Sequence, residues 1–377
     1  MLIEVRKEEA NAVEGYIAKV ISNRFEGAAP HELVKVIRTQ GQTYDVFSFV
    51  GPTERLSEED FKALEGVERV TRLSLPFKAL AKYHKTPGEE KVEHPDIQVN
   101  IGDRILTKGG FIFFAGPCAV EKKPVVNGKE FSGLEYTKTV ACQIAEVAAE
   151  YGIQDHGVLR GCPWKPRSST YSFQGVGVEG LLVMDEARKA SGLPYICEAL
   201  DQEQANIIAN HADGMWIGAR NSMNQSLIES VAKTGKPWGH KNGIKGMGLE
   251  EQLAWMEYGA KTGNDQCFII ERGHQDDVVG KYQRNHGDMM RALGNKRLSR
   301  VPVIIDPSHM IANPRTIPDV SCAAIEYFGF DGLILDVGLD GADRSTFLCD
   351  GQQFLTISDF RKLVGRLVPI LKEQGKL

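Results

Sequence analysis

The sequence predicts an α/β protein in which a (β/α)8 TIM barrel follows a small ferredoxin-like α+β domain. Three observations predict this fold. Residues 1–82 alternate strand and helix patterns in the order βαββαβ, which is typical of a ferredoxin-like unit. Residues 83–98 are charged and contain two prolines and a glycine, as a linker does. Between residues 99 and 377, a short apolar run followed by a helical stretch recurs eight times, as in a barrel.

The elements of the first domain follow from short alternating and helical patterns. Strands are expected in residues 2–6 and 68–75, a hairpin in 32–51, and helices in 8–25 and 57–67. These segments hold no concentration of reactive side chains. We therefore expect this domain to regulate or to mediate assembly rather than to catalyse.

The eight apolar runs of the second domain are expected to be the barrel strands. In chain order they read FIFFAGPCAV, HGVLRG, LPYICEAL, GMWIGARN, KPWGHKNG, CFIIERG, VPVIIDPSH and GLILDVG. Residues 97–110 are expected to form a hairpin that closes the bottom of the barrel. The active site of this fold lies at the C-terminal ends of the strands, so the last residues of each run are the candidates for function.

Composition excludes several kinds of partner. The 377 residues include 45 Lys and Arg and 50 Asp and Glu, and the net charge of −5 argues against a general nucleic-acid or membrane surface. No apolar run approaches the length of a membrane span, and the N-terminus has no apolar leader. Seven cysteines without a CxxC pair fit a reducing compartment, so we expect a cytoplasmic protein.

Every predicted strand ends in a chemically functional side chain. In strand order these are Cys118, Arg160, Glu198, Arg220, Lys241, Glu271 with Arg272, Asp306 with His309, and Asp336. A single charged residue at a strand end is usually just solvated or salt-bridged. Eight strand ends that converge on one barrel face instead predict a site. Within it, we expect Glu198 and Glu271 to orient neighbouring cations.

One sector of this face has the composition of a metal site. Strands seven, eight and one are neighbours in a closed barrel, and they carry His309, Asp336 and Cys118. Asp350, in the loop after strand eight, can reach the same sector. A thiolate, an imidazole and two carboxylates suit a divalent ion such as Mn, Fe, Co or Zn, without selecting among them. Alone, Cys118 would be read as a small buried hydrophobe.

The remaining sector is cationic. Arg160, Arg220, Lys241 and Arg272 end their strands there, and Lys165 and Arg167 follow strand two. Guanidinium groups bind carboxylate and phosphate oxygens in pairs, so this sector predicts one or two small substrates with several negative charges. The glycines of GVGVEG (175–180) match a dinucleotide fingerprint, but no buried strand precedes them, and we expect an ordinary loop leading into a helix.

Six motifs, AGPCAVE, LRGCPWKPRSSTYSFQG, GARN, ERG, DPSH and CDGQQ, occur in this order along the chain. Together they resemble the 3-deoxy-D-arabino-heptulosonate 7-phosphate (DAHP) synthase family, in its shorter type with an N-terminal ferredoxin-like domain. The resemblance implies condensation of phosphoenolpyruvate with erythrose 4-phosphate and release of phosphate, the first step of the shikimate pathway. It also implies homotetramers and admits an aromatic amino acid as effector.

The resemblance further implies residue roles. Arg220, Lys241 and Arg272 would hold the phosphate of phosphoenolpyruvate, and Arg160 and Lys165 its carboxylate side. Arg167 and Ser168 would face the aldose phosphate. Cys118, His309 and Asp350 match metal ligands, and the metal would polarise the aldehyde or position a water while Lys165 delivers a proton.

Three departures from the family pattern leave alternatives open. Asp336 stands where the family usually has glutamate, strand five reads GHKNG, and Gln352 stands where lysine is common. The aspartate arm is one methylene shorter, so we expect it to be the least secure metal ligand. The alternatives are a 3-deoxy-D-manno-octulosonate 8-phosphate-type synthase or paralogue that uses another aldose phosphate, and a non-catalytic sensor of phosphorylated metabolites.

Overall fold

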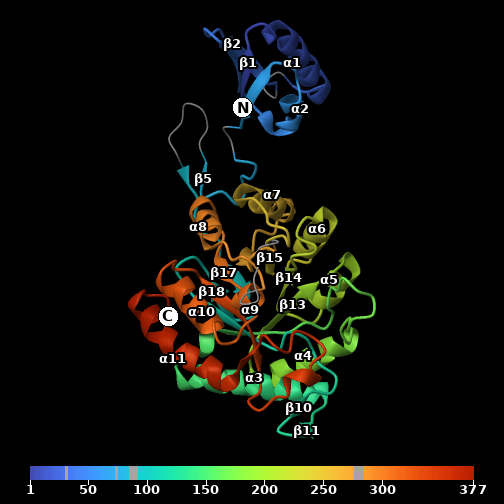
Figure 1. The fold of residues 1–377 in the computed structure, drawn as a ribbon, viewed down its shortest axis with the longest axis vertical. Coiled ribbons are helices and arrows are strands. Elements are labelled where there is room, and N and C mark those ends of the chain that lie inside the picture. The colour runs from blue at the N-terminus through green and yellow to red at the C-terminus, as the bar shows by residue number, and fades with distance from the viewer. Residues whose placement is uncertain (30–32, 73–74, 85–91, 276–283) are drawn as a thin grey trace. The chain divides into compact units, whose positions relative to one another are not determined.

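The computed structural model describes residues 1–29, 33–72, 75–84, 92–275 and 284–377. The chain divides into two compact units, Met1–Pro76 and Phe77–Leu377, each with its own core. Figure 1 shows the course of the chain through both units.

The first unit has the predicted ferredoxin-like fold. Its elements are β1 (Leu2–Arg6), α1 (Ala10–Arg24), β2 (Lys35–Thr39), β3 (Tyr44–Val50), α2 (Glu59–Lys62) and β4 (Val67–Thr71). The strands pair antiparallel in the order β2-β3-β1-β4. Alternation along β1 and β3 sends Ile3, Val5, Phe47 and Phe49 into the core, where Ile17 of α1 covers them.

The second unit is a closed parallel barrel. Its eight strands are β9 (Ile112–Gly116), β12 (Gly157–Arg160), β13 (Tyr195–Ala199), β14 (Gly214–Ile217), β15 (Trp238–Lys241), β16 (Cys267–Glu271), β17 (Val303–Ile305) and β18 (Gly332–Gly338). Each lies within one of the eight predicted runs, and pairing of β17 with β18 and of β18 with β9 closes the barrel. A short strand, β19 (Leu355–Thr356), pairs in parallel with the C-terminal end of β18.

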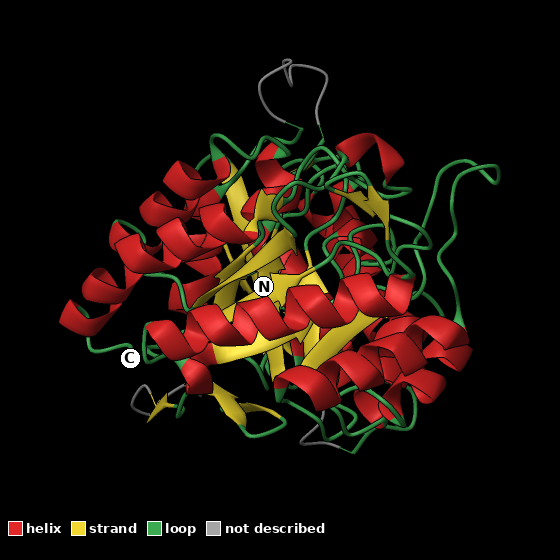
Figure 2. Ribbon diagram, turned by 90° about the horizontal axis from the view of Figure 1, so that it is seen from below, coloured by secondary structure: helices red, strands yellow, loops and turns green. Residues whose placement is uncertain are grey.

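Helices surround the barrel, as Figure 2 shows. They are α3 (Gly133–Glu150), α4 (Val178–Ser191), α5 (Gln202–Ala209), α6 (Gln225–Lys233), α7 (Leu249–Ala260), α8 (Met289–Leu298), α9 (Pro307–Ile311), α10 (Ile317–Glu326) and α11 (Ile357–Glu373). Because helices cover the outside and side chains fill the inside, every residue of these eight strands is buried. Burial on both faces explains why the strand sequences are apolar throughout and do not alternate with polar residues.

Three two-stranded hairpins complete the unit: β5 (Tyr83–His84) with β6 (Val92–Glu93), β7 (Val99–Ile101) with β8 (Arg104–Leu106), and β10 (Val125–Val126) with β11 (Lys129–Glu130). The hairpin expected in residues 97–110 is the pair β7 and β8.

Asp331 and Lys296 form an ion pair of 2.5 Å at the N-terminal end of β18, opposite the candidate site.

The division between the units differs from the expected boundary at residue 82. Backbone N–H groups of Lys78, Ala79 and Leu80 donate to the Glu257 carboxylate on α7, and Ala81 bridges to Ser299. The expected linker 83–98 also belongs largely to the second unit, since its described ends form β5 and β6, while residues 85–91 lie outside the described residues. Charge and proline content suggested a linker, but buried side chains before and after it hold the chain against the barrel.

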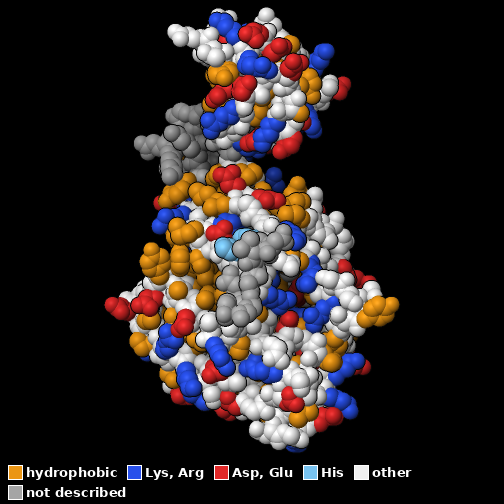
Figure 3. Space-filling view, in the orientation of Figure 1, with side chains coloured by type: hydrophobic (Ala, Val, Ile, Leu, Met, Phe, Trp, Pro, Cys, Tyr) orange, Lys and Arg blue, Asp and Glu red, His pale blue; other side chains and the backbone are white. Residues whose placement is uncertain are grey.

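The visible surface carries acidic and basic side chains side by side over both units, as Figure 3 shows. Among the described residues, every helix is too short or too polar to cross a membrane.

Candidate active site

The C-terminal ends of the strands surround a cavity of about 370 Å³. Among the predicted site residues, it is lined by Lys165, Arg167, Ser168, Arg220, Lys241, Arg272, His309 and Asp350. Cys118, Arg160 and Asp336 are buried at the same strand ends but are not among the lining residues. Convergence of the strand ends, the central expectation from the sequence, is therefore observed.

The cavity lining is strongly cationic. Among the described residues, six cations line it, namely Lys165, Arg167, Arg220, Lys241, Arg272 and Arg284, together with the acids Glu198 and Asp350. Arg284 does not stand at the end of a predicted strand, so the sequence pattern does not single it out. Burial lowers the pKa of Arg272 to about 10, which still leaves this guanidinium charged at neutral pH.

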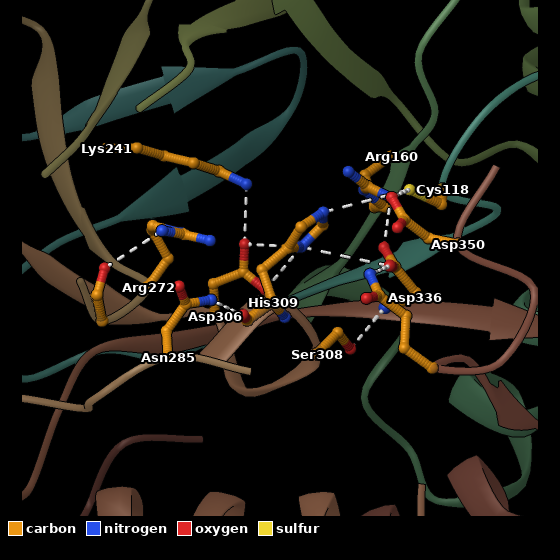
Figure 4. A network of polar contacts seen from close by, with 12 residues as sticks. Cys118, Arg160, Lys241, Arg272, Asn285, Asp306, Ser308, His309, Asp336 and Asp350 are labelled. Atoms are coloured by element: carbon orange, nitrogen blue, oxygen red, sulfur yellow. Dashed lines mark hydrogen bonds and ion pairs between the residues drawn. The ribbon is translucent and has the colours of Figure 1, made fainter. Parts of the chain in front are cut away.

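The buried carboxylate of Asp306 connects Lys241 of the cationic sector to His309. Asp306 Oδ2 accepts from Lys241 Nζ at 2.6 Å, and Asp306 Oδ1 lies 3.0 Å from His309 Nδ1 (Figure 4). Asp306 is also the N-cap of α9, where its carboxylate accepts from the backbone N–H of His309. Because His309 Nδ1 faces a carboxylate, its Nε2 lone pair is presented on the other side, toward Cys118 Sγ at 3.9 Å. Burial lowers the pKa of His309, which favours the neutral imidazole that a metal requires.

Arg160 and Asp336 form an ion pair with both side chains 1% exposed. They extend from β12 and β18, the two strands that flank β9 at Gly116. A side chain on Gly116, whose φ is 155°, would lie 2.1 Å from the carbonyl oxygen of Arg160, so only glycine allows the strands this approach. Gln353 Nε2 donates to the other carboxylate oxygen of Asp336 at 2.5 Å. Both oxygens of Asp336 thus have partners inside the protein.

Thiols and carboxylates gather beside this pair. Cys118 Sγ lies 3.6 Å from Cys349 Sγ, 3.4 Å from Asp350 Oδ2 and 3.2 Å from Lys165 Nζ. Within the described residues, two groups of three have ligand atoms within 4.8 Å of one another: Cys118, His309 and Asp336, and Cys118, Cys349 and Asp350. Sulfur, imidazole and carboxylate donors in one cluster fit a divalent first-row metal ion.

Charges around the cluster set its protonation. The hydrogen bond between the two thiols raises the pKa of Cys118 and lowers that of Cys349. Burial alone would lower the pKa of Lys165, but electrostatic interaction with Cys118 and the neighbouring cysteines raises it well above its usual value. Lys165 is therefore an ammonium group, placed between the thiols and the cavity.

Glu121 fixes the loop that carries Cys349 and Asp350. Its carboxylate accepts from the backbone N–H groups of Leu348 at 2.9 Å and Cys349 at 3.1 Å. The carbonyl of Leu348 in turn accepts from Arg167 Nη2 at 3.4 Å, which links this loop to the loop after β12.

Several residues of the site differ from the sequence expectations. Cys349 and Gln353 were missed, because neither ends a strand and a cysteine or glutamine inside a loop has no spacing signal. Gln352, which the sequence reasoning selected, is exposed, and the adjacent Gln353 points inward. Glu271, expected to orient neighbouring cations, pairs with Arg291, a cation that the sequence does not single out, and accepts from the backbone N–H of Gly273 at 2.7 Å.

Fold and site together define a barrel protein of the class that binds small, multiply charged anions at its C-terminal face. The sequence profile of the DAHP synthetase I family matches residues 96–372. The chain belongs to this family.

Individual relatives agree with this assignment. The chain is 32% identical over 338 residues, 89% of its length and 90% of the relative's, to phospho-2-dehydro-3-deoxyheptonate aldolase of Thermotoga maritima. It is 28% identical over 276 residues, 68% of its length, to 2-dehydro-3-deoxyphosphooctonate aldolase of Syntrophotalea carbinolica. The crystal structure of the Thermotoga maritima DAHP synthase superposes with a TM-score of 0.81 at 27% identity and covers 99% of this chain and 98% of that one. The likeness extends over both units.

Proposed function

We propose that this chain condenses phosphoenolpyruvate with erythrose 4-phosphate to DAHP, with water consumed and inorganic phosphate released, and that a divalent metal ion at the Cys118 cluster assists. The observation that carries the proposal is the cavity that six cations of the described chain line, beside a thiol, imidazole and carboxylate cluster, in a member of the DAHP synthetase I family. Two phosphates and one carboxylate are the charges that such a lining would neutralise.

The cations divide the cavity between the two substrates. Arg220, Lys241 and Arg272 line the cavity at the ends of β14, β15 and β16 or just beyond them, and are assigned to the phosphate of phosphoenolpyruvate. Arg167 and Ser168, from the loop after β12, are assigned to the aldose phosphate. Holding both reactants in one cavity replaces a bimolecular encounter by a positioned one.

Lys165 lies where the two substrates meet. Its ammonium is 3.2 Å from Cys118 Sγ, and it lines the cavity. We assign it to the aldehyde oxygen, to which it donates a hydrogen bond and then a proton as the new carbon–carbon bond turns that oxygen into an alkoxide. Arg160 stays assigned to the carboxylate side of phosphoenolpyruvate as the resemblance implies; it is 1% exposed, is paired with Asp336 and lies outside the cavity lining.

A bound metal would supply Lewis acidity at the aldehyde. Cys118, His309 and Asp350 are the residues assigned to hold it, with Asp306 and Lys241 orienting His309. Removal of metal by a chelator should abolish turnover, and addition of Zn²⁺, Co²⁺ or Mn²⁺ should restore it.

Phosphate release tests the proposal most simply. The full chain is assayed with phosphoenolpyruvate and, separately, erythrose 4-phosphate, arabinose 5-phosphate and ribose 5-phosphate. We expect the highest kcat/KM with erythrose 4-phosphate. A preference for arabinose 5-phosphate would favour the octulosonate-type alternative, and absence of release with every aldose phosphate in metal-loaded protein would favour the sensor.

A further inference from the structure

Cys349 is a buried thiol that the assigned roles leave unused. It is 2% exposed, and its Sγ lies 3.6 Å from Cys118 Sγ and 3.3 Å from Asp350 Oδ2. Asp350, the next residue, has a φ of 51°, in the left-handed region. In an extended chain two consecutive side chains point to opposite sides, but this turn directs both toward Cys118. The two backbone N–H bonds to Glu121 hold the turn in place.

Asp336 is engaged elsewhere. Its two oxygens bind Arg160 and Gln353. If it bound a metal ion instead, Arg160 would lose its charge partner while 1% exposed, and an unpaired buried charge is costly. The shorter aspartate arm and the buried arginine therefore favour the ion pair over coordination.

The spacing of the sulfur and oxygen atoms matches a metal polyhedron. With bonds of 2.3 Å to sulfur and about 2.0 Å to nitrogen or oxygen, a tetrahedral ion separates two sulfurs by about 3.8 Å, and sulfur from nitrogen or oxygen by about 3.5 Å. The observed separations from Cys118 Sγ are 3.6 Å to Cys349 Sγ, 3.9 Å to His309 Nε2 and 3.4 Å to Asp350 Oδ2. Cys349 Sγ to Asp350 Oδ2 is 3.3 Å. These four edges lie within a few tenths of an ångström of the expected values. The two remaining edges, from His309 Nε2 to Cys349 and to Asp350, are longer than 4.8 Å, so His309 would have to shift toward the other three ligands when an ion binds.

The surroundings also suit two thiolates. Two thiolates and a carboxylate give a divalent ion one excess negative charge. Lys165 Nζ, 3.2 Å from Cys118 Sγ, and Arg284 Nη1, 3.1 Å from Asp350 Oδ1, lie close enough to offset it.

We infer that Cys349 is a ligand of the metal ion, together with Cys118, His309 and Asp350, while Asp336 stays paired with Arg160. A second sulfur shifts the preference of the site toward softer ions, Zn²⁺, Co²⁺ or Fe²⁺, over Mn²⁺. This inference rests on the proposed metal dependence, but it concerns the ligand set and not the reaction.

X-ray absorption of the zinc-loaded full chain, kept reduced and without substrates, counts the sulfur ligands. We expect two sulfurs at about 2.3 Å in the unaltered protein and one in Cys349→Ser. Cobalt gives a second readout, because each thiolate ligand adds to the near-ultraviolet charge-transfer band. The band should fall by about half in Cys349→Ser and in Cys118→Ser, as expected when one of two thiolate ligands is lost. The matched control is Cys322→Ser, a thiol on α10 outside both ligand groups, which should leave the sulfur count and the band unchanged.

Competition with a chelator measures the affinity of each variant for Zn²⁺. Loss of one ligand should weaken Zn²⁺ binding by at least about 10-fold in Cys349→Ser. One sulfur in the unaltered protein, or an identical sulfur count in Cys349→Ser, would overturn the inference and leave metal-dependent turnover standing. Failure of the unaltered protein to bind Zn²⁺ or Co²⁺ would instead overturn both the inference and the proposed metal dependence.

Discussion

Asp306→Asn should separate two effects of one buried carboxylate. The aspartate is 1% exposed, binds Lys241 Nζ at 2.6 Å and His309 Nδ1 at 3.0 Å, and caps α9. Asparagine has almost the same shape and keeps the cap, but it is uncharged and one of its two terminal atoms is a donor. Lys241 Nζ and the Nδ1–H of His309 are themselves donors, so one of them must then face the amide NH₂ of the asparagine.

The substitution should change both the stability of the protein and its metal affinity, by amounts that can be estimated. Removing one partner of a buried ion pair costs about 3–5 kcal/mol, and because Lys241 also borders the cavity we expect the lower end, about 3 kcal/mol. Loss of the carboxylate that orients a metal-binding histidine should weaken metal affinity by about 10- to 100-fold.

Two assays on the full chain measure these effects separately. Urea unfolding of metal-free protein gives the stability change, and competition with a fluorescent chelator gives the change in Zn²⁺ affinity. Asp331→Asn is the matched control, because Asp331 is equally buried and pairs with Lys296 at 2.5 Å, at the other end of the barrel. It should lose comparable stability and keep its metal affinity. Unaltered metal affinity in Asp306→Asn would refute the orienting role, and unaltered stability would refute the ion-pair argument.

Three further predictions address the substrate cavity, a buried histidine and the first unit. Arg167→Ala should raise the KM for erythrose 4-phosphate by about 10- to 100-fold, the worth of a charged hydrogen bond, with a much smaller change for phosphoenolpyruvate; equal changes in steady-state kinetics would contradict the division of the cavity. Burial lowers the pKa of His240 to about 4, so between pH 6.5 and 4 the unfolded chain binds a proton that the folded chain does not. The free energy of unfolding should therefore fall as pH falls through this window, and His240→Gln should reduce that loss by about 3 kcal/mol in urea unfolding at pH 7 and pH 4; an unchanged pH dependence would show that His240 does not titrate as argued. A chain that begins at Phe77 should retain phosphate release, since the site lies wholly in the second unit; a folded but inactive product would assign the first unit a role in catalysis or assembly.

The barrel could be predicted because its signals are local and repeated. Both faces of each strand are buried, so runs such as those around Phe114 and Ile269 are apolar without alternation, and a functional residue marks where each strand ends. Closure of the barrel then places the strand ends in one ring. This geometry brings Lys241, Arg272 and His309 to one cavity although they are far apart in sequence.

The rest of the site depends on side-chain choices that spacing does not encode. Asp336 was predicted as a metal ligand from its strand end, but whether it faces a metal or Arg160 depends on the adjacent β12 and on Gln353. Cys349 lies in an irregular loop, and only the turn at Asp350 directs it inward. The first unit ends at Pro76 and not at residue 82 for a similar reason, because the hydrogen bonds that tie residues 78–81 to Glu257 of α7 and to Ser299 join segments far apart in the sequence.

Product analysis of a single reaction tests the central claim most directly. The metal-loaded full chain is incubated with phosphoenolpyruvate and erythrose 4-phosphate, and phosphate is counted while the sugar product is identified by mass. The account predicts one seven-carbon 3-deoxy sugar acid phosphate for each phosphate released. Release of phosphate with pyruvate and without a new carbon–carbon bond, or no consumption of phosphoenolpyruvate at all, would contradict it.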